Sequence, residues 1–86
     1  MVFMKELFYT YVLRSEKDGR LYIGYSKDLK IRLQKHRKGQ VPATRHRRPL
    51  KLIYFEACLS KKGAIEREKQ LKTGYGRAYL KRRLGL

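Results

Sequence analysis

The sequence of 86 residues contains one cysteine, two histidines, no tryptophan and seven acidic residues. Because Cys58 has no second cysteine to pair with, an intrachain disulfide is excluded, and the well-separated histidines argue against a structural zinc site. No apolar run approaches the roughly 20 residues that cross a bilayer, and residues 1–10 lack the apolar core of a secretory signal. We therefore expect a single cytoplasmic domain that spans residues 1–86.

The chain has a large excess of positive charge. Twenty-three Lys and Arg residues oppose the seven acids, which gives a formal net charge of +16 at pH 7. This excess costs self-repulsion unless a polyanion is the partner, and nucleic acid is the commonest polyanion. A 42% apolar fraction with seven Tyr and three Phe still supports a folded core. The composition favours a small nucleic-acid-binding domain over a merely soluble basic surface.

The order of apolar segments and turn residues predicts an α+β fold. Residues 8–14 and 21–25 are dense in aromatic and β-branched residues and flank a turn, so we expect a β-hairpin. A four-residue loop in this hairpin would place Tyr11 directly opposite Tyr22, with both rings on one face of the sheet. Residues 50–59 are expected to form a third strand, with Cys58 as a small buried side chain.

The first predicted helix runs over residues 27–38, with Ser26 as its N-cap and Gly39 as its end. Leucines recur one turn apart on this helix, and Arg32 and His36 are also one turn apart at the margin of the buried face. Residues 39–49 follow the helix and are expected to form an exposed basic loop. Further helices are predicted from Ser60 to about residue 73 and over residues 77–84, which completes the order β-β-α-β-α-α.

The helix after Ser60 carries an inward carboxylate. At about 100° per residue its apolar side chains share one arc, Glu68 falls in the middle of that arc, and Glu66 falls nearly opposite. A desolvated carboxylate without a partner costs several kcal/mol, so an inward glutamate indicates a cation, a hydrogen-bond network or a cleft. The alternative is a pair with Lys72 one turn on, worth only about 0.3–0.5 kcal/mol.

Tyrosines on a sheet face, an arginine and a histidine one turn apart, and one inward glutamate are residue types that suit phosphodiester chemistry. A carboxylate can hold Mg²⁺ while water and phosphate oxygens complete its coordination. Arginine matches the charge of a pentavalent phosphate, and a tyrosine or histidine can take a proton from water. The alternative is that the tyrosines fill a small core, with the arginine and the histidine as ordinary solvated helix residues.

In chain order, the motifs Tyr9-Thr10-Tyr11 and Tyr22-Ile23-Gly24, followed by Arg32 and Glu68, resemble the GIY-YIG nuclease domain. The resemblance covers about residues 8–84 and is greatest to small single-domain members. It is more distant to the N-terminal domain of the excision-repair incision subunit. The resemblance implies a three-stranded antiparallel sheet flanked by helices, and hydrolysis of DNA phosphodiester bonds with one divalent metal ion, Mg²⁺ or Mn²⁺. Repair or recombination is the process that such an activity would serve.

The resemblance also implies a role for each matching residue. Tyr11, assisted by His36, would activate water, and Tyr22 would position that water or share the task. Arg32 would stabilise the phosphate, and Glu68 would bind the metal. We expect further contacts to nucleic acid, DNA rather than RNA, from Tyr9, Lys27, Arg45, His46, Arg47, Arg48 and Lys72.

The sequence departs from the family pattern at three points, of which the second and third define an alternative. Tyr9 replaces the first glycine, which changes local packing and not the chemistry, and Tyr25 stands where many members have a lysine or a small polar residue. The chain also contains no asparagine, although one usually follows the metal-binding glutamate in this family. The alternative function is therefore a catalytically inactive, basic nucleic-acid-binding module with the same fold. A protein partner that supplies specificity is a third hypothesis, since 86 residues leave little room for a separate specificity element.

Overall fold

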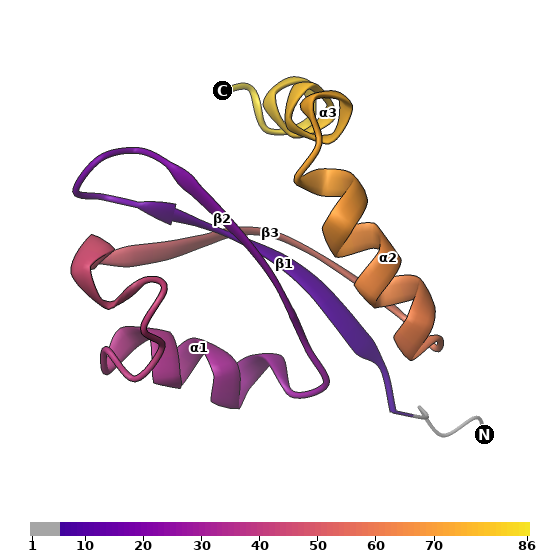
Figure 1. Cartoon of the computed structure of the whole chain (residues 1–86), viewed down its shortest axis with the longest axis horizontal. Coiled ribbons are helices and arrows are strands. Elements are labelled where there is room, and N and C mark those ends of the chain that lie inside the picture. The colour runs from indigo at the N-terminus through magenta and orange to yellow at the C-terminus, as the bar shows by residue number, and fades with distance from the viewer. Residues whose placement is uncertain (1–5) are drawn as a thin grey trace.

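The computed structural model describes residues 6–86, in which three strands and three α-helices follow one another in the order that the sequence predicts. The strands form one antiparallel sheet with the order β2-β1-β3 (Figure 1). The predicted α+β fold and its element order are therefore confirmed. None of the helices in this part of the chain is long and apolar enough to cross a membrane. The elements are β1 (Phe8–Ser15), β2 (Leu21–Ser26), α1 (Leu29–Arg37), the 3-10 turn η1 (Arg45–Arg47), β3 (Leu50–Cys58), α2 (Lys61–Leu71) and α3 (Gly74–Leu84).

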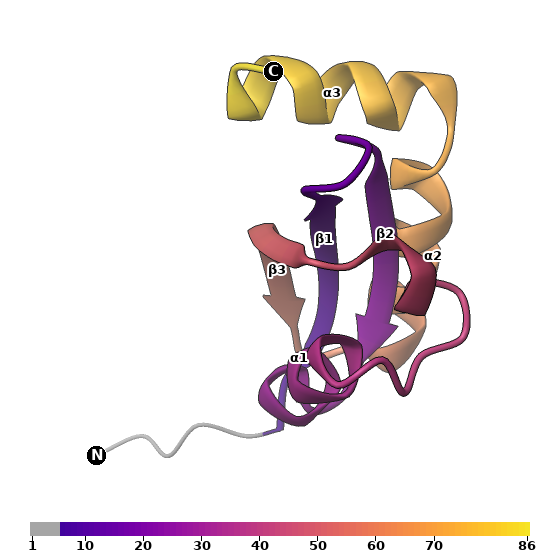
Figure 2. The same cartoon turned by 90° about the vertical axis from the view of Figure 1, so that its left-hand side faces the viewer.

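The sheet is covered by α1 on one face and by α2 on the other (Figures 1 and 2). Neighbouring side chains of a strand point to opposite faces, and β1 shows this directly. Thr10 donates a hydrogen bond to the carbonyl oxygen of Ala64 in α2, at 2.8 Å. The next residue, Tyr11, is hydrogen-bonded to His36 in α1. The α1 face therefore carries the candidate site, and the α2 face carries the apolar core.

The apolar core lies between the sheet, α2 and α3. Val12 and Ile23 of the sheet pack with Leu71 of α2 and Leu80 of α3, and all four are buried. At the junction of the two helices a Cβ on Gly76 would lie 2.2 Å from the carbonyl oxygen of Gln70. Only glycine permits this close approach of α3 to the end of α2.

The register of the hairpin differs from the predicted one by two residues. Tyr11 lies opposite Gly24, and Tyr22 lies opposite Leu13. The loop has four residues, as predicted, but starts one residue later, because Gly19 has a positive φ of 73° and belongs inside the turn. A shift of two residues leaves both tyrosine rings on the same face of the sheet.

Two helix starts also differ from the predictions. Asp28, not Ser26, is the N-cap of α1, because its carboxylate accepts a hydrogen bond from the Ile31 amide at 3.1 Å. The Ser26 hydroxyl instead accepts from the Asp28 amide, two residues before the helix. Helix α3 begins at Gly74 rather than at residue 77, because the Thr73 hydroxyl caps it by accepting from the Gly76 amide.

Residues 39–49 are less exposed than predicted, and Cys58 is more exposed. Val41 and Thr44 are buried although they lie in the basic loop. Cys58 is exposed and its thiol donates to the carbonyl oxygen of Ser60 at 3.2 Å. The prediction of a buried cysteine was wrong because Cys58 is the last residue of β3, which is an edge strand.

Candidate active site

Tyr11 lies at the centre of a buried hydrogen-bonded chain on the α1 face of the sheet. Its hydroxyl oxygen is 2.7 Å from Nε2 of His36 and accepts a hydrogen bond from Nε of Arg32 at 3.3 Å. Arg32 and His36 are one turn apart on α1, so both reach the same point of β1. His36 is only 1% exposed, well inside the predicted margin of the buried face, since Thr44 closes over it from the following loop.

The hydrogen-bonding capacity of the chain assigns the proton on His36. Arg32 can only donate, so the Tyr11 oxygen accepts from it. Within residues 6–86 the Tyr11 O–H has no acceptor other than Nε2 of His36, so we assign Tyr11 as the donor of that hydrogen bond. The imidazole proton is then on Nδ1, which donates to Oγ1 of Thr44 at 2.7 Å. Burial, followed by the nearby charge of Arg32, lowers the pKa of His36 to about 4. His36 is therefore neutral at physiological pH and accepts a hydrogen bond from Tyr11.

Tyr11 is held as a neutral phenol. Burial is the main factor that raises the pKa of its hydroxyl, and the charges of Tyr22 and Glu68 act in the same direction. The hydrogen bond from Arg32 and the charge of its guanidinium oppose this rise without reversing it. Because the Tyr11 side chain is 0% exposed, solvent does not reach this hydroxyl in the free protein.

Each of residues 22–24 has a different role in the site. The Tyr22 ring lies 6.4 Å from that of Tyr11 and 5.3 Å from that of His36, so it completes an aromatic cluster. Ile23 points the other way, into the apolar core. Gly24 leaves room for Tyr11, because a Cβ there would lie 2.5 Å from the tyrosine hydroxyl. The motif therefore supplies a ring, a core residue and a gap.

Glu68 lies on α2 and faces inward as the helical pattern predicts, whereas Glu66 is exposed. The Glu68 side chain is 21% exposed and accepts a hydrogen bond from Nζ of Lys72 at 2.9 Å. The ion pair between Glu68 and Lys72, which was the alternative explanation for an inward Glu68, is thus present. The Glu68 charge is the smallest of the named causes that raise the pKa of Tyr11.

Glu68 is compatible with a divalent metal ion. No group of three or more His, Cys, Asp or Glu side chains gathers at one point within residues 6–86. A metal ion at Glu68 would thus take most of its ligands from water and phosphate. Mg²⁺ is commonly held in this way, by one or two carboxylates with several waters retained. The donor set therefore fits a hard ion such as Mg²⁺ better than a soft one.

The expected nucleic-acid contacts are separated into three places. Tyr9 and Lys27 line a groove beside the N-terminus of α1, and Lys72 pairs with Glu68. The cations of residues 45–48 lie in the loop next to the turn of the β-hairpin. Two of them, Arg47 and Arg48, make contacts within the protein. Arg47 lies 3.8 Å from the Asp18 carboxylate, and Arg48 donates to the carbonyl oxygen of Arg45 at 3.0 Å.

Thr44 and Gly24 are the site residues that the sequence did not assign. Thr44 was placed in an exposed loop, yet it is 0% exposed and orients His36. No local pattern marks it, because the contact forms only when residues 39–44 fold back over α1. Gly24 belongs to the motif of residues 22–24, but a glycine is needed there because the Tyr11 ring lies over it. That contact depends on the hairpin register.

Comparison with known proteins agrees with this geometry. A family model described as the GIY-YIG catalytic domain matches residues 7–83. The chain therefore belongs to the GIY-YIG family, which is a nuclease family, and the resemblance drawn from its motifs is confirmed. Nucleases of this family generally use a divalent metal ion and act on nucleic acid.

Within this family the chain is similar to UPF0213 proteins. It is 44% identical to one from Staphylococcus saprophyticus over 66 residues, which cover 76% of this chain and 79% of that protein. It is 41% identical to another from Staphylococcus aureus strain Mu3, with the same coverage of both chains. The solution NMR structure of a UPF0213 protein from Bacillus halodurans is similar with a TM-score of 0.54 and 32% identity, and the match covers 86% of this chain and 81% of that one.

Proposed function

We propose that the protein is a metal-dependent endonuclease that hydrolyses phosphodiester bonds in DNA. The observation that carries this proposal is the hydrogen-bonded pair of Tyr11 and His36 with Arg32 beside it, in a domain of a nuclease family. A neutral imidazole with a phenol bound to it and a fixed cation next to it is suited to moving a proton near a phosphate. The relatives are bacterial, and bacterial DNA lies in the cytoplasm, so we expect the protein to act there.

The two tyrosines divide the task of preparing water. Tyr22 keeps part of its surface exposed and is the tyrosine that water reaches, whereas Tyr11 is buried. Tyr11 donates a hydrogen bond from its hydroxyl to Nε2 of His36 and keeps the histidine in place. The sequence favoured Tyr11 for direct contact with water, and burial makes Tyr22 the better candidate for that contact.

Arg32 would bind the scissile phosphate. Its guanidinium is always charged and is planar, so it can contact two phosphate oxygens as negative charge develops on them. The hydrogen bond from its Nε to Tyr11 fixes the plane of the group. Glu68 would hold Mg²⁺ or Mn²⁺ in place of the Lys72 ammonium. The ion would supply positive charge at the phosphate.

A second candidate function is a nucleic-acid-binding module that does not cleave. The Lys72 ion pair, which already neutralises Glu68, favours it, as does a chain without asparagine. Such a module would bind DNA or RNA with a strong dependence on salt and none on metal. A protein partner that supplies specificity is compatible with both functions.

The test compares cleavage by Glu68→Ala and by Glu66→Ala, a matched control on the exposed side of the same helix. Supercoiled plasmid, a branched DNA and an RNA of matching sequence are incubated with Mg²⁺, with Mn²⁺ or with EDTA. We expect metal-dependent DNA nicking that Glu68→Ala lowers on the order of 100-fold or more, the size typical for loss of an electrostatic group in the transition state.

The controls separate the two candidate functions. Glu66→Ala should cleave as the wild type does. Equal cleavage by the wild type and Glu68→Ala overturns the assignment of Glu68. No cleavage by any variant, with binding to DNA retained, excludes an endonuclease that acts without a partner and favours the module that does not cleave.

A further inference from the structure

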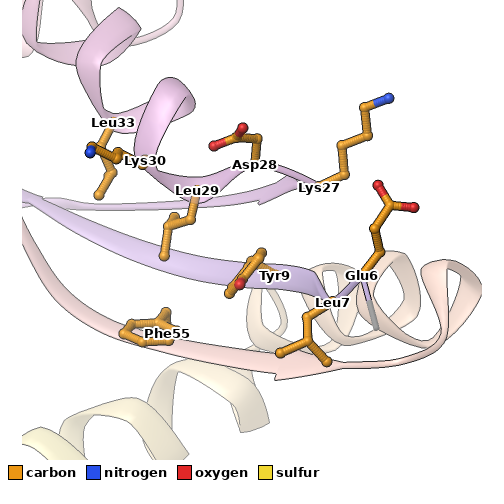
Figure 3. A pocket seen from close by; sticks show the side chains of 9 residues that line it. All are labelled: Glu6, Leu7, Tyr9, Lys27, Asp28, Leu29, Lys30, Leu33 and Phe55. Carbon is orange, nitrogen blue, oxygen red and sulfur yellow. The ribbon is translucent and has the colours of Figure 1, made fainter. Parts of the chain in front are cut away.

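A groove opens beside the candidate active site, between α1 and the sheet, and the hydrolytic roles proposed above leave most of its lining unused. Its volume is about 710 Å³, within the range of roughly 300–1,000 Å³ for small-ligand pockets. Figure 3 shows the Tyr9 and Phe55 rings on its floor, from β1 and β3, with Leu29 and Leu33 of α1 above them. The groove is thus an apolar slot walled by one helix.

The floor of the groove is a pair of aromatic rings, of which Tyr9 is partly buried and Phe55 is exposed. The Tyr9 and Phe55 rings have centroids 6.1 Å apart and planes tilted by 55°. Phe55 is 51% exposed, although the sheet face on which it lies carries a helix that could have covered it. An aromatic side chain of this size gains from burial, so a half-exposed ring in a groove is typical of a binding surface.

The charges on the rim of this groove balance. Lys27 and Lys30 bring two positive charges, and Glu6 and Asp28 bring two negative ones. The Asp28 carboxylate is also engaged as the N-cap of α1. The rim of the groove therefore has no net formal charge, unlike the basic loop. A neutral, flat and aromatic group fits this combination of floor and rim.

The groove is next to the residues that would act on the phosphate. Tyr9 precedes Tyr11 by two residues on the same face of β1, a distance of about 6.6 Å along a strand. Phe55 is the direct cross-strand partner of Tyr11. A group that stacks on this floor and a phosphate bound at Arg32 can thus belong to one nucleic-acid strand.

We propose that the groove binds an unpaired base of the substrate strand, stacked on Phe55 and Tyr9 next to the cleaved phosphate. The inference rests on the proposed nuclease function and names its substrate class, a nucleic acid with a single-stranded segment at the cleavage site. Bases in a continuous duplex are covered on both faces by their neighbours. Only an unpaired or unstacked base can offer a face to an aromatic ring.

The test measures binding without metal ion, so that it does not depend on cleavage. The probe is an oligonucleotide duplex with a single-stranded arm that carries the fluorescent base 2-aminopurine, and the reference is a continuous duplex with the same base. The wild type should change the 2-aminopurine fluorescence of the arm. Phe55→Leu keeps an apolar side chain without a ring, and it should abolish this change and weaken binding to the armed duplex on the order of tenfold.

Two more variants complete the design. Phe55→Trp keeps a ring and should restore the signal. Tyr75→Leu removes an aromatic residue that is 92% exposed on α3, outside the groove, and should bind both probes as the wild type does. Equal weakening of both probes by Phe55→Leu, or no effect on either, overturns the inference.

The result is separable from that of the nuclease assay. If the fluorescence change depends on Phe55 but no variant cleaves, the groove is confirmed and the endonuclease is not. If Glu68-dependent cleavage occurs with no role for Phe55 in binding the arm, the endonuclease stands and the base-binding groove does not.

Discussion

His36 is a buried histidine with a partner at each ring nitrogen. Tyr11 and Thr44 each lie 2.7 Å from it, from a strand and from a loop. Burial without these partners would cost roughly 1–3 kcal/mol for each unsatisfied group. Within residues 6–86 no buried side-chain nitrogen or oxygen lacks a hydrogen-bond partner. The network therefore holds the imidazole neutral and in one orientation.

We expect the stability of the protein to fall as pH is lowered from about 6.5 to about 4, in part because of His36. The pKa of His36 is lowered from 6.5 to about 4 in the folded state. Between these values the unfolded chain binds a proton that the folded chain does not, so unfolding is favoured as pH falls. The contribution of this one group is on the order of 3 kcal/mol, lost progressively across that window.

Urea denaturation of the wild type and His36→Gln at pH 7, 5.5 and 4.5 measures this effect. Glutamine offers Tyr11 an acceptor but does not titrate. The variant should lose less stability than the wild type over the same range, since other acid-sensitive groups are common to both. Equal losses would show that His36 is not the group responsible.

At the scale of one element, β2 serves both faces of the sheet. Tyr22 and Gly24 face α1 and the candidate site, and Ile23 faces the core. The site requires glycine at position 24, as it requires a ring at position 22, because Tyr11 lies across Gly24. The strand therefore couples the geometry of the site to the packing of the sheet.

We expect Gly24→Ala to displace the Tyr11 ring and to break its bond to His36. The added Cβ would lie 2.5 Å from the Tyr11 hydroxyl, and overpacking of this kind costs about 1–3 kcal/mol. Gly74→Ala is the matched control, because a Cβ there meets nothing within 4 Å. Thermal unfolding and nicking should both be impaired in Gly24→Ala and unchanged or slightly improved in Gly74→Ala. The same behaviour of the two variants would contradict the close approach at Gly24.

At the scale of the whole molecule, cations line the surface beside the hairpin turn and the basic loop. The Lys17 ammonium donates to the carbonyl oxygen of His46, and the Ser15 hydroxyl donates to that of Arg47, so the basic loop is tied to the turn of the hairpin. The loop is thus held in place before any ligand binds. A fixed set of cations fits a backbone of phosphates and gives position without reading sequence.

We expect Arg45→Gln to weaken DNA binding and to lower its salt dependence without loss of stability. If Arg45 contacts one phosphate, the slope of log K against log salt should fall by about 0.9. Arg47→Gln should also destabilise the protein, since Arg47 contacts Asp18 and the carbonyl oxygen of Leu21. Lys62→Gln, in the first turn of α2 and outside the surface that the loop lines, is the control. A slope unchanged by Arg45→Gln would remove this residue from the contact surface.

The sequence by itself determined the order of the elements, the shared face of the two tyrosines and the inward position of Glu68. These features follow from periods of 2 and 3.6 residues along the chain, which are local. The motif order also sufficed to place the chain in its family, as the match over residues 7–83 confirms.

The tertiary structure alone decided the hairpin register, the contact of Thr44 with His36 and the exposure of Phe55. The hydrogen bonds of Tyr11 join residues 25 and 21 positions apart, and each needs a strand and a helix to be packed first. Such contacts arise from the way elements meet, and no local pattern encodes them. For that reason the types of the site residues were readable from the sequence, whereas the network that holds them, and the groove beside them, were not.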